Sequence, residues 1–415
     1  MSIDAIKVGW FLAARQITRG SAWSTILIGA IMTLTFLNVV VVRGVLLGLP
    51  EGAITLYERQ YAGQVIVTPL SSNRSIERSA SVRAIIADTP GFVAMSERLS
   101  VGGSVEANYD RPRRGSELPD RVVADIAGID AEAEQRITQL ASYVVEGEYL
   151  AEGDRTGILI GSQLIDRYTF GPIVSNALED VYPGSRVLVT LGENTREFTV
   201  RGIITSKVGE VDRRVYIDRT TMRGMLARTD GNVDEIAIKL VPGSDPSRFA
   251  TALVSAGVGE LAVVQTARES LGQFIDDIVA TFDILSVLIG AIGLMVAAIT
   301  IFIVIFINAL SRSRQIGILK GIGISEFAIQ CSYLFLSVFY AASGIVVGWL
   351  VVTFAIAPYL DQNPIDFPFS DGVLSVTTGD MLASASLIVV ATVIAGFIPA
   401  RRIIAKNTIA AILGR

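Results

Sequence analysis

The stretch SRSRQIGILKGIGIS, at Ser311–Ser325, decides how the rest of the chain is organised. Long uncharged apolar runs lie immediately before it and shortly after it. A short basic segment between two runs of membrane-spanning length is expected to form a loop on one face of a bilayer. Its basic residues are Arg312, Arg314 and Lys320. By the positive-inside rule these residues predict that the loop, residues 311–326, lies in the cytoplasm.

The same segment also carries apolar side chains and glycines at helical spacing. The apolar residues are Ile316, Ile318, Leu319 and Ile322, and the glycines are Gly317, Gly321 and Gly323. This is more apolar surface than a connecting loop needs. We therefore predict a short helix that docks on a cytoplasmic partner. The alternative is a positively charged topology anchor whose hydrophobic residues have no partner.

Composition indicates a membrane protein with a large polar domain. Of the 415 residues, 51% are hydrophobic and 18% are charged, and most of the charges lie between Glu51 and Asp283. The net charge of −5 argues against a nucleic-acid partner. Cys331 is the only cysteine and there is no histidine, which excludes an internal disulfide, His-based catalytic triads and Cys or His metal clusters.

Four uncharged runs predict four transmembrane helices. They are Ser21–Val42, Ile284–Leu310, Phe327–Leu360 and Met381–Ala400, of 22, 27, 34 and 20 residues. The segment between the last two runs holds four aspartates and no basic residue, so we expect it on the extracytoplasmic side of the membrane, whereas the basic tail is expected in the cytoplasm.

These assignments divide the chain into nine segments. We expect a cytoplasmic amphipathic helix at 1–20, a first transmembrane helix with its stalk at 21–63, an extracytoplasmic α+β domain at 64–266, a stalk with the second transmembrane helix at 267–310, the cytoplasmic segment at 311–326, a third transmembrane helix at 327–358 that ends at Pro358, an extracytoplasmic loop at 359–380, a fourth transmembrane helix at 381–400 and a cytoplasmic tail at 401–415. Both termini are therefore predicted to lie in the cytoplasm.

The polar domain alternates strand and helix patterns, which predicts an α+β fold with two subdomains. Strands are expected at Gln64–Pro69, Val122–Ile129, Arg186–Leu191, Arg196–Ile204, Arg214–Asp218 and Glu235–Leu240. Helices are expected at Ser162–Phe170, Arg219–Ala227 and Pro246–Ser255, and an exposed loop at Arg111–Pro119.

Motifs for enzymes and for ion carriers are missing from the sequence. It contains neither a G-x-x-x-x-G-K-[ST] phosphate loop nor a G-x-S-x-G elbow. The interiors of the apolar runs hold almost no ionisable residues, which argues against an ion-coupled carrier. The pair Gly344 and Gly348 allows close helix packing, either within the chain or in a dimer. Arg401 and Arg402 could contact a partner or hold the helix end at the lipid headgroups.

Two motifs and the order of the segments resemble the FtsX-like permeases of ABC transporters. That family shows an R-x-x-E-I-G-I-L-K-A-I-G-A-S-like segment after its second helix, and this chain departs from it at Gln315 and Gly321. The family's closing motif, P-A-R-R/K-A-A-x-x-x-P-x-x-A-L, is similar to PARRIIAKNTIAAIL at Pro399–Leu413, where Asn407 and Thr408 stand in place of the usual D-P. The polar domain is similar to the MacB/LolC periplasmic type in GID, VVEGEYL, ILIGSQLIDRY, PGSRVLV and FTVRGII, which begin at Gly128, Val144, Ile158, Pro183 and Phe198.

The resemblance implies a permease subunit of a LolC- or MacB-like ABC transporter in the inner membrane, acting on lipoproteins or other amphiphilic substrates. It implies that two copies of a separate ATPase dock on the cytoplasmic segment at residues 311–326. By the same resemblance, the ATPase binds ATP and Mg, and the chain itself binds no cofactor or metal. A second permease chain, identical or different, and a lipoprotein, lipid or periplasmic adaptor are further implied partners. The residues implied in coupling are Arg312, Arg314, Ile316, Gly317, Ile318, Leu319, Lys320 and Gly323.

Two other functions are compatible with the sequence. An FtsX-like transducer would move nothing and would regulate an extracytoplasmic partner such as a cell-wall hydrolase. A bare membrane anchor or sensor would have no ATPase, but the apolar residues between Ile316 and Ile322 argue against it. The length of the polar domain at Gln64–Thr266 favours the transporter subunit over the transducer.

Overall fold

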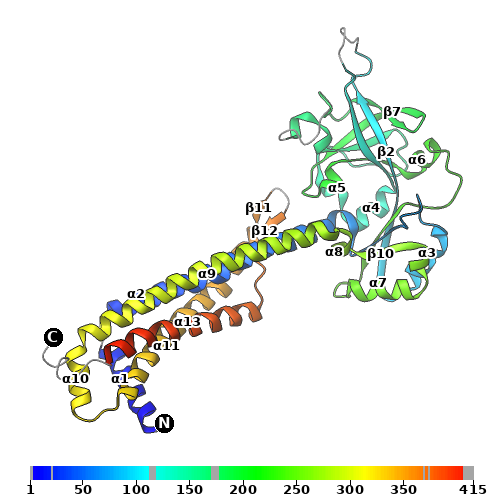
Figure 1. Cartoon of the computed structure of the whole chain (residues 1–415). Coiled ribbons are helices and arrows are strands. Elements are labelled where there is room, and N and C mark those ends of the chain that lie inside the picture. Colours follow the sequence, from blue (N-terminus) through cyan, green and yellow to red (C-terminus); the bar gives the residue numbers. More distant parts are fainter. Residues whose placement is uncertain are drawn as a thin grey trace. The chain divides into compact units, whose positions relative to one another are not determined.

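The computed structural model describes residues 3–19, 22–111, 118–169, 177–367, 370–372 and 374–404. The chain forms two compact units, shown in Figure 1. The helical unit comprises Met1–Glu51, Asp277–Asp366 and Gly372–Arg415, and the α+β unit comprises Gly52–Asp276 and Phe367–Asp371. Each unit is described separately below.

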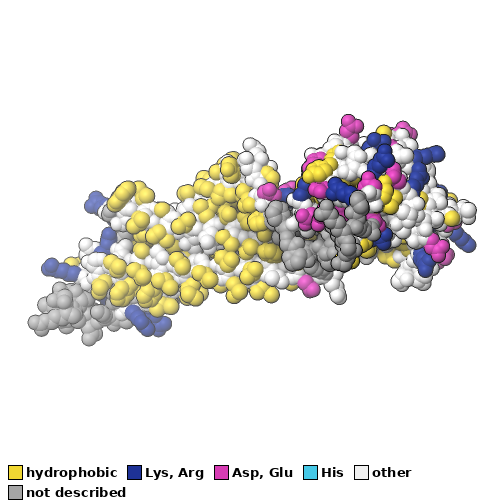
Figure 2. Space-filling model, turned by 90° about the horizontal axis from the view of Figure 1, so that it is seen from above, with side chains coloured by type: hydrophobic (Ala, Val, Ile, Leu, Met, Phe, Trp, Pro, Cys, Tyr) yellow, Lys and Arg dark blue, Asp and Glu magenta, His cyan; other side chains and the backbone are white. Residues whose placement is uncertain are grey.

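The helical unit is built from four helices that are long and apolar enough to cross a membrane, within Ala22–Ala62, Ile275–Ser311, Glu326–Gln362 and Thr378–Arg402. Its helices are α1 (Ile3–Arg19), α2 (Ala22–Tyr57), α9 (Gly272–Ser311), α10 (Ser313–Gly321), α11 (Glu326–Val351), α12 (Ala357–Gln362) and α13 (Thr378–Ile404). A short hairpin, β11 (Ile365–Phe367) and β12 (Ser370–Gly372), precedes α13. Apolar side chains cover the face of the helical part seen in Figure 2.

Glycines on α11 let it pack closely on α2. A Cβ placed on Gly344 would lie 2.3 Å from the Cβ of Met32, and a Cβ on Gly348 would lie 2.6 Å from the Cδ1 of Phe36. No larger residue fits there without moving one of the helices. The sequence left two uses open for this glycine pair, and the structure assigns it to packing within the chain.

The prediction that Pro358 ends the third long helix is wrong. A π-helical turn, Val352–Ile356, follows α11, and the chain continues as α12 to Gln362. Pro358 lies in the first turn of α12, where a missing N–H costs little.

The α+β unit holds a ten-stranded sheet in the order β10-β1-β9-β2-β3-β8-β5-β7-β4, with β6 pairing with β2 and β7. The strands are β1 (Val65–Pro69), β2 (Phe92–Ala107), β3 (Arg121–Ile129), β4 (Val144–Gly147), β5 (Gly157–Gly161), β6 (Arg186–Leu191), β7 (Asn194–Ile204), β8 (Arg214–Asp218), β9 (Glu235–Leu240) and β10 (Ala262–Thr266). The short helices are α3 (Ser79–Asp88), α4 (Ala131–Thr138), α5 (Gly209–Asp212), α6 (Arg219–Met225), α7 (Pro246–Ser255) and α8 (Ala267–Ser270). The π-helical turn η1, Glu58–Ala62, precedes β1.

Strand β2 joins the two lobes of this unit (Figure 1). Residues Phe92–Arg98 pair with β9 in one lobe, and Leu99–Ala107 pair with β3 and β6 in the other. A single long strand therefore belongs to both lobes, which agrees with the prediction of two subdomains. The sequence prediction did not include this strand.

All six predicted strands and the helices at Arg219 and Pro246 are confirmed, with ends shifted by a few residues. The helix predicted at Ser162–Phe170 is wrong. Ser162–Leu164 and Asp166–Tyr168 form two 3-10 turns, because the extended Ile165 between them bridges to Leu178. Phe170 and most of the loop predicted at Arg111–Pro119 lie outside the described residues.

Candidate functional site

The segment at Ser311–Ser325 forms a helix between two sharp changes of direction. Arg312, with non-helical backbone angles, separates α9 from α10. Gly323 ends α10 at a φ of 91°, a left-handed conformation that glycine adopts without strain, and this allows the N–H of Ile324 to bond to Leu319 O at 3.0 Å. The side chain of Ser325 then caps α11 by accepting from Ala328 N at 3.3 Å. The predicted short helix is confirmed.

The inner face of α10 packs within the chain. Ile316 is only 4% exposed and belongs to the core of the helical unit, and Gly317 beside it is buried. Lys320 donates to the carbonyl of Ile404, the last residue of α13, at 2.8 Å and pairs with Glu326 at 2.7 Å. These contacts stabilise the position of α10, so Ile316, Gly317 and Lys320 do not lie on its open face.

The outer face of α10, here called the coupling face, consists of Arg314, Ile318, Gly321 and Ile322. Ile318 is 51% exposed and Ile322 is 70% exposed, and Arg314 and Gly321 are also exposed. A Cβ on Gly321 would meet no atom within 4 Å. Two large aliphatic side chains next to an arginine on an open helical face are typical of a docking surface.

A groove of about 530 Å³ lies between α1 and α10. It is lined by Leu12, Arg15, Gln16, Arg19, Arg312, Gln315, Ile318 and Leu319, and we call it the α1–α10 groove. Three residues that were expected at the partner surface, Arg312, Ile318 and Leu319, line this groove. Arg401 and Arg402 are exposed on the last turn of α13, and the tail from residue 405 onward, including Lys406, Asn407, Thr408 and Arg415, lies outside the described residues.

Comparison with known proteins identifies the family. Residues 25–256, more than half of the chain, match the family model of the MacB-like periplasmic core domain, and residues 287–408 match that of the FtsX-like permease C-terminal region. The chain belongs to the FtsX-like permease family of ABC transporters. The second match includes α10 and the coupling face. The permease is accordingly a multi-pass membrane protein.

Two curated relatives are the macrolide export ATP-binding/permease proteins MacB of two strains of Campylobacter jejuni subsp. jejuni. Each is 27% identical over 258 residues, which is 57% of this chain and 38% of the relative. The chain thus spans little more than a third of the length of these relatives.

Among solved structures, the periplasmic region of MacB from Actinobacillus actinomycetemcomitans is 13% identical with a TM-score of 0.35, covering 52% of this chain and 94% of that one. The extracellular domain of the noncanonic ABC-type transporter YknZ from Gram-positive bacteria is 10% identical with a TM-score of 0.32, covering 49% and 98%.

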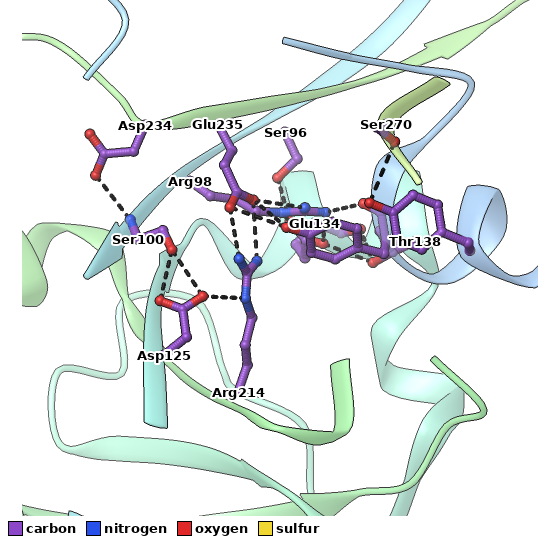
Figure 3. A network of polar contacts seen from close by, with 12 residues as sticks. Ser96, Arg98, Ser100, Asp125, Glu134, Thr138, Arg214, Asp234, Glu235 and Ser270 are labelled. Atoms are coloured by element: carbon purple, nitrogen blue, oxygen red, sulfur yellow. Dashed lines mark hydrogen bonds and ion pairs between the residues drawn. The ribbon is translucent and has the colours of Figure 1, made fainter. Parts of the chain in front are cut away.

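A buried network of charges lies where the α+β unit of the permease begins, and sequence reasoning missed it (Figure 3). Arg98 on β2 is 1% exposed and bonds Glu134 on α4 at 2.7 Å and 2.9 Å, while its third nitrogen lies 3.4 Å from Glu235 on β9. Arg214 on β8 bonds both oxygens of Glu235, at 2.7 and 3.2 Å. Arg98 also donates to the main-chain carbonyl of Tyr61 at 2.6 Å. The network therefore connects the turn after α2 to both lobes.

Ion pairing keeps these groups charged despite their burial. Burial alone raises the pKa of Glu235, but the opposing charges of Arg214 and Arg98 and the hydrogen bond from Tyr61 lower it to about 2. Burial likewise raises the pKa of Glu134, and the charge and hydrogen bonds of Arg98 hold it below its usual value. Arg98 and Glu134 are 36 residues apart in the chain, and only the unpredicted strand β2 brings them together. The sequence of β2 has no alternating strand pattern, so it gives no signal that Arg98 is buried.

Among the residues that the structure describes, no group of three His, Cys, Asp or Glu side chains comes close enough to hold a metal ion.

Proposed function

We propose that this chain is the permease subunit of an ABC transporter in which two copies of a separate ATPase dock on the coupling faces of two permease chains. In this proposal ATP and Mg bind to the ATPase, and hydrolysis moves the α+β unit to extract or export lipoproteins or other amphiphilic substrates. The family membership supports the role of permease. The observation that carries the docking site is the exposure of Ile318 and Ile322 on α10, a helix whose other face is anchored in the core.

The proposed topology places α10 and both termini in the cytoplasm of the cell, with the permease in the inner membrane. The helix α1, the helix α10 and the last residue of α13 lie at the same end of the helical unit (Figure 1). This end carries Arg15, Arg19, Arg314 and the pair Arg401–Arg402. The segment between α12 and α13 carries aspartates and no basic residue. The positive-inside rule supports this orientation.

The second permease chain is proposed to pack on lipid-facing apolar side chains, because the glycine pair of α11 is already used within the chain. Helix α9 contains the least buried of the four candidate spans, and its Ile292, Met295 and Ile299 are each more than half exposed. A lipoprotein, a lipid or a periplasmic adaptor is the proposed partner of the α+β unit, in keeping with the match to the MacB-like periplasmic core domain.

The test is affinity purification of the full chain from its native membrane in mild detergent, followed by mass spectrometry. An ABC ATPase should co-purify with the wild-type chain in a near-equal amount. It should not co-purify with Ile318→Asp or with Ile322→Asp. Val123→Asp is the matched control, because Val123 is 80% exposed in the α+β unit and should leave the ATPase in place. Retention of the ATPase by both α10 variants contradicts the docking site.

The same experiment separates transport from signalling. A lipoprotein that co-purifies supports extraction or export. A cell-wall hydrolase instead supports the alternative, an FtsX-like transducer that regulates an extracytoplasmic partner.

A further inference from the structure

The α1–α10 groove carries three positive charges that the described part of the chain does not neutralise. Arg15, Arg19 and Arg312 line it, and no Asp or Glu is among its lining residues. No ion pair links any of the three guanidinium groups to a carboxylate within the described residues. Gln16 lines the same groove, and its Oε1 atom is buried without a hydrogen-bond partner there. Three like charges around one groove repel each other, and a bound anion would reduce that repulsion.

The shape and lining of the groove fit a phosphate group attached to an apolar body. Guanidinium groups bind phosphate oxygens in pairs, and the carboxamide of Gln16 can turn to present its NH2 group as a further donor. Leu12, Ile318 and Leu319 supply an apolar wall beside these donors. A volume of about 530 Å³ is larger than a single inorganic ion needs.

The groove also lies at the depth where lipid headgroups are expected. Arg312 is the residue that follows the apolar span Ile275–Ser311. On α1, Trp10 and Phe11 are 62% and 63% exposed, as is typical of a helix that rests in the membrane interface. Figure 2 shows Lys and Arg side chains at the end of the helical part, beyond the apolar band. A membrane lipid therefore fits the groove better than a soluble anion or a protein.

We infer that the α1–α10 groove binds the phosphate of an anionic phospholipid and that this lipid joins α1 to α10 beside the coupling face. The inference rests on the proposed orientation of the permease. Basic pockets at the cytoplasmic ends of membrane helices bind such headgroups through the same chemistry. The bound lipid would neutralise the repulsion between Arg15 and Arg19 on α1 and Arg312 before α10.

The test is native mass spectrometry of the full chain in detergent, titrated with dioleoylphosphatidylglycerol or with the neutral dioleoylphosphatidylcholine. No ATPase is present, so the result is independent of whether the coupling face binds one. Wild type should bind the first phosphatidylglycerol at least tenfold more tightly than phosphatidylcholine. Arg15→Gln/Arg19→Gln should weaken phosphatidylglycerol binding at least tenfold and leave phosphatidylcholine binding unchanged, since each basic residue near a membrane surface contributes roughly fivefold.

Arg401→Gln/Arg402→Gln is the matched control, because it removes the same charge from exposed arginines outside the groove. It should change phosphatidylglycerol binding by less than twofold. The inference is overturned if wild type shows no preference for the anionic lipid, or if the control pair weakens binding as much as the groove pair.

Two further outcomes identify a different occupant and also overturn it. Displacement of the lipid by millimolar inorganic phosphate would assign the groove to a free anion. Unchanged lipid binding in Arg15→Gln/Arg19→Gln, together with loss of the co-purifying ATPase from the same variant, would assign it to the protein partner. In that case the proposed docking function would stand and the lipid site would not.

Discussion

Replacing Glu134 with Gln should destabilise the α+β unit severely. The change keeps the size of the side chain and removes its charge, which leaves the guanidinium of Arg98 buried at 1% exposure with only Glu235, at 3.4 Å, as an ionic partner. Ser96 and Thr138, which also donate to the Glu134 carboxylate, would face an amide that can accept through only one oxygen. Removing one partner of a buried ion pair costs about 3–5 kcal/mol.

The chain offers a matched control on the same helix. Glu132, two residues before Glu134 on α4, pairs with Arg136 at 3.0 Å, but both side chains are more than half exposed. Exposed pairs of this kind contribute about 0.3–0.5 kcal/mol. Glu132→Gln should therefore have almost no effect, although the chemical change is identical.

The assay is thermal unfolding of the full chain in detergent, followed by hydrogen exchange in peptides from β2 and α4. For a unit of this size each kcal/mol lowers the midpoint by about 2–4 °C, so Glu134→Gln should lower it by roughly 6–20 °C. Arg98→Met/Glu134→Leu should recover most of the loss, because an apolar pair leaves no unpaired charge. Midpoints for Glu134→Gln and Glu132→Gln within about 1 °C of each other would refute this reasoning.

Three other predictions follow from the same structure. When the pH falls from 7 to 5, the free energy of unfolding of the α+β unit should rise by about 1 kcal/mol. Burial raises the pKa of Asp212 from 3.8 to about 6, so in this range the folded state binds a proton that the unfolded state does not. Asp212→Asn should abolish this rise in denaturant titrations. Below about pH 4.5 stability should fall as the pH approaches the folded pKa of Glu235, about 2, and Glu235→Gln should remove that acid-side loss in the same titrations. Gly344→Leu should lower the temperature at which half of the monodisperse peak is lost in size-exclusion chromatography, because the new side chain would overlap Met32. Gly290→Leu should leave that temperature unchanged, because a Cβ there meets nothing within 4 Å.

The membrane part could be predicted closely because one physical rule governs it. Uncharged runs of bilayer length must become helices, and each of the four spans of the structure overlaps one of the four predicted runs. The errors there concern local chemistry. The sequence predicts that the third helix ends at Pro358, but the preceding π turn places this residue in the first turn of α12, where helices tolerate proline. The role of Gly344 could not be decided from sequence, because the spacing of small residues is the same for packing within a chain and between chains.

The open face of α10, which is the proposed docking site, could be predicted only in part, because a helical pattern does not show which face is covered. The sequence correctly placed a short helix at α10, but it assigned Ile316 and Ile318 to the same surface. The structure buries Ile316 against the chain's own core and leaves Ile318 exposed. Ile316→Asp would therefore damage folding and would not test docking, whereas Ile318→Asp does. The charge network was missed altogether, because strand β2 has no alternating pattern and its partners are far apart in sequence.

The position of that network gives it a role in the proposed mechanism. The two ends of the α+β unit lie side by side, since β1 pairs antiparallel with β10 and Val65 is opposite Thr266. Just before β1, the carbonyl of Tyr61 accepts from Arg98, whose strand belongs to both lobes. A displacement of the turn after α2 must either stretch this bond or move β2 with it. Because breaking the buried contacts of Arg98 is costly, movement of β2 is the easier response.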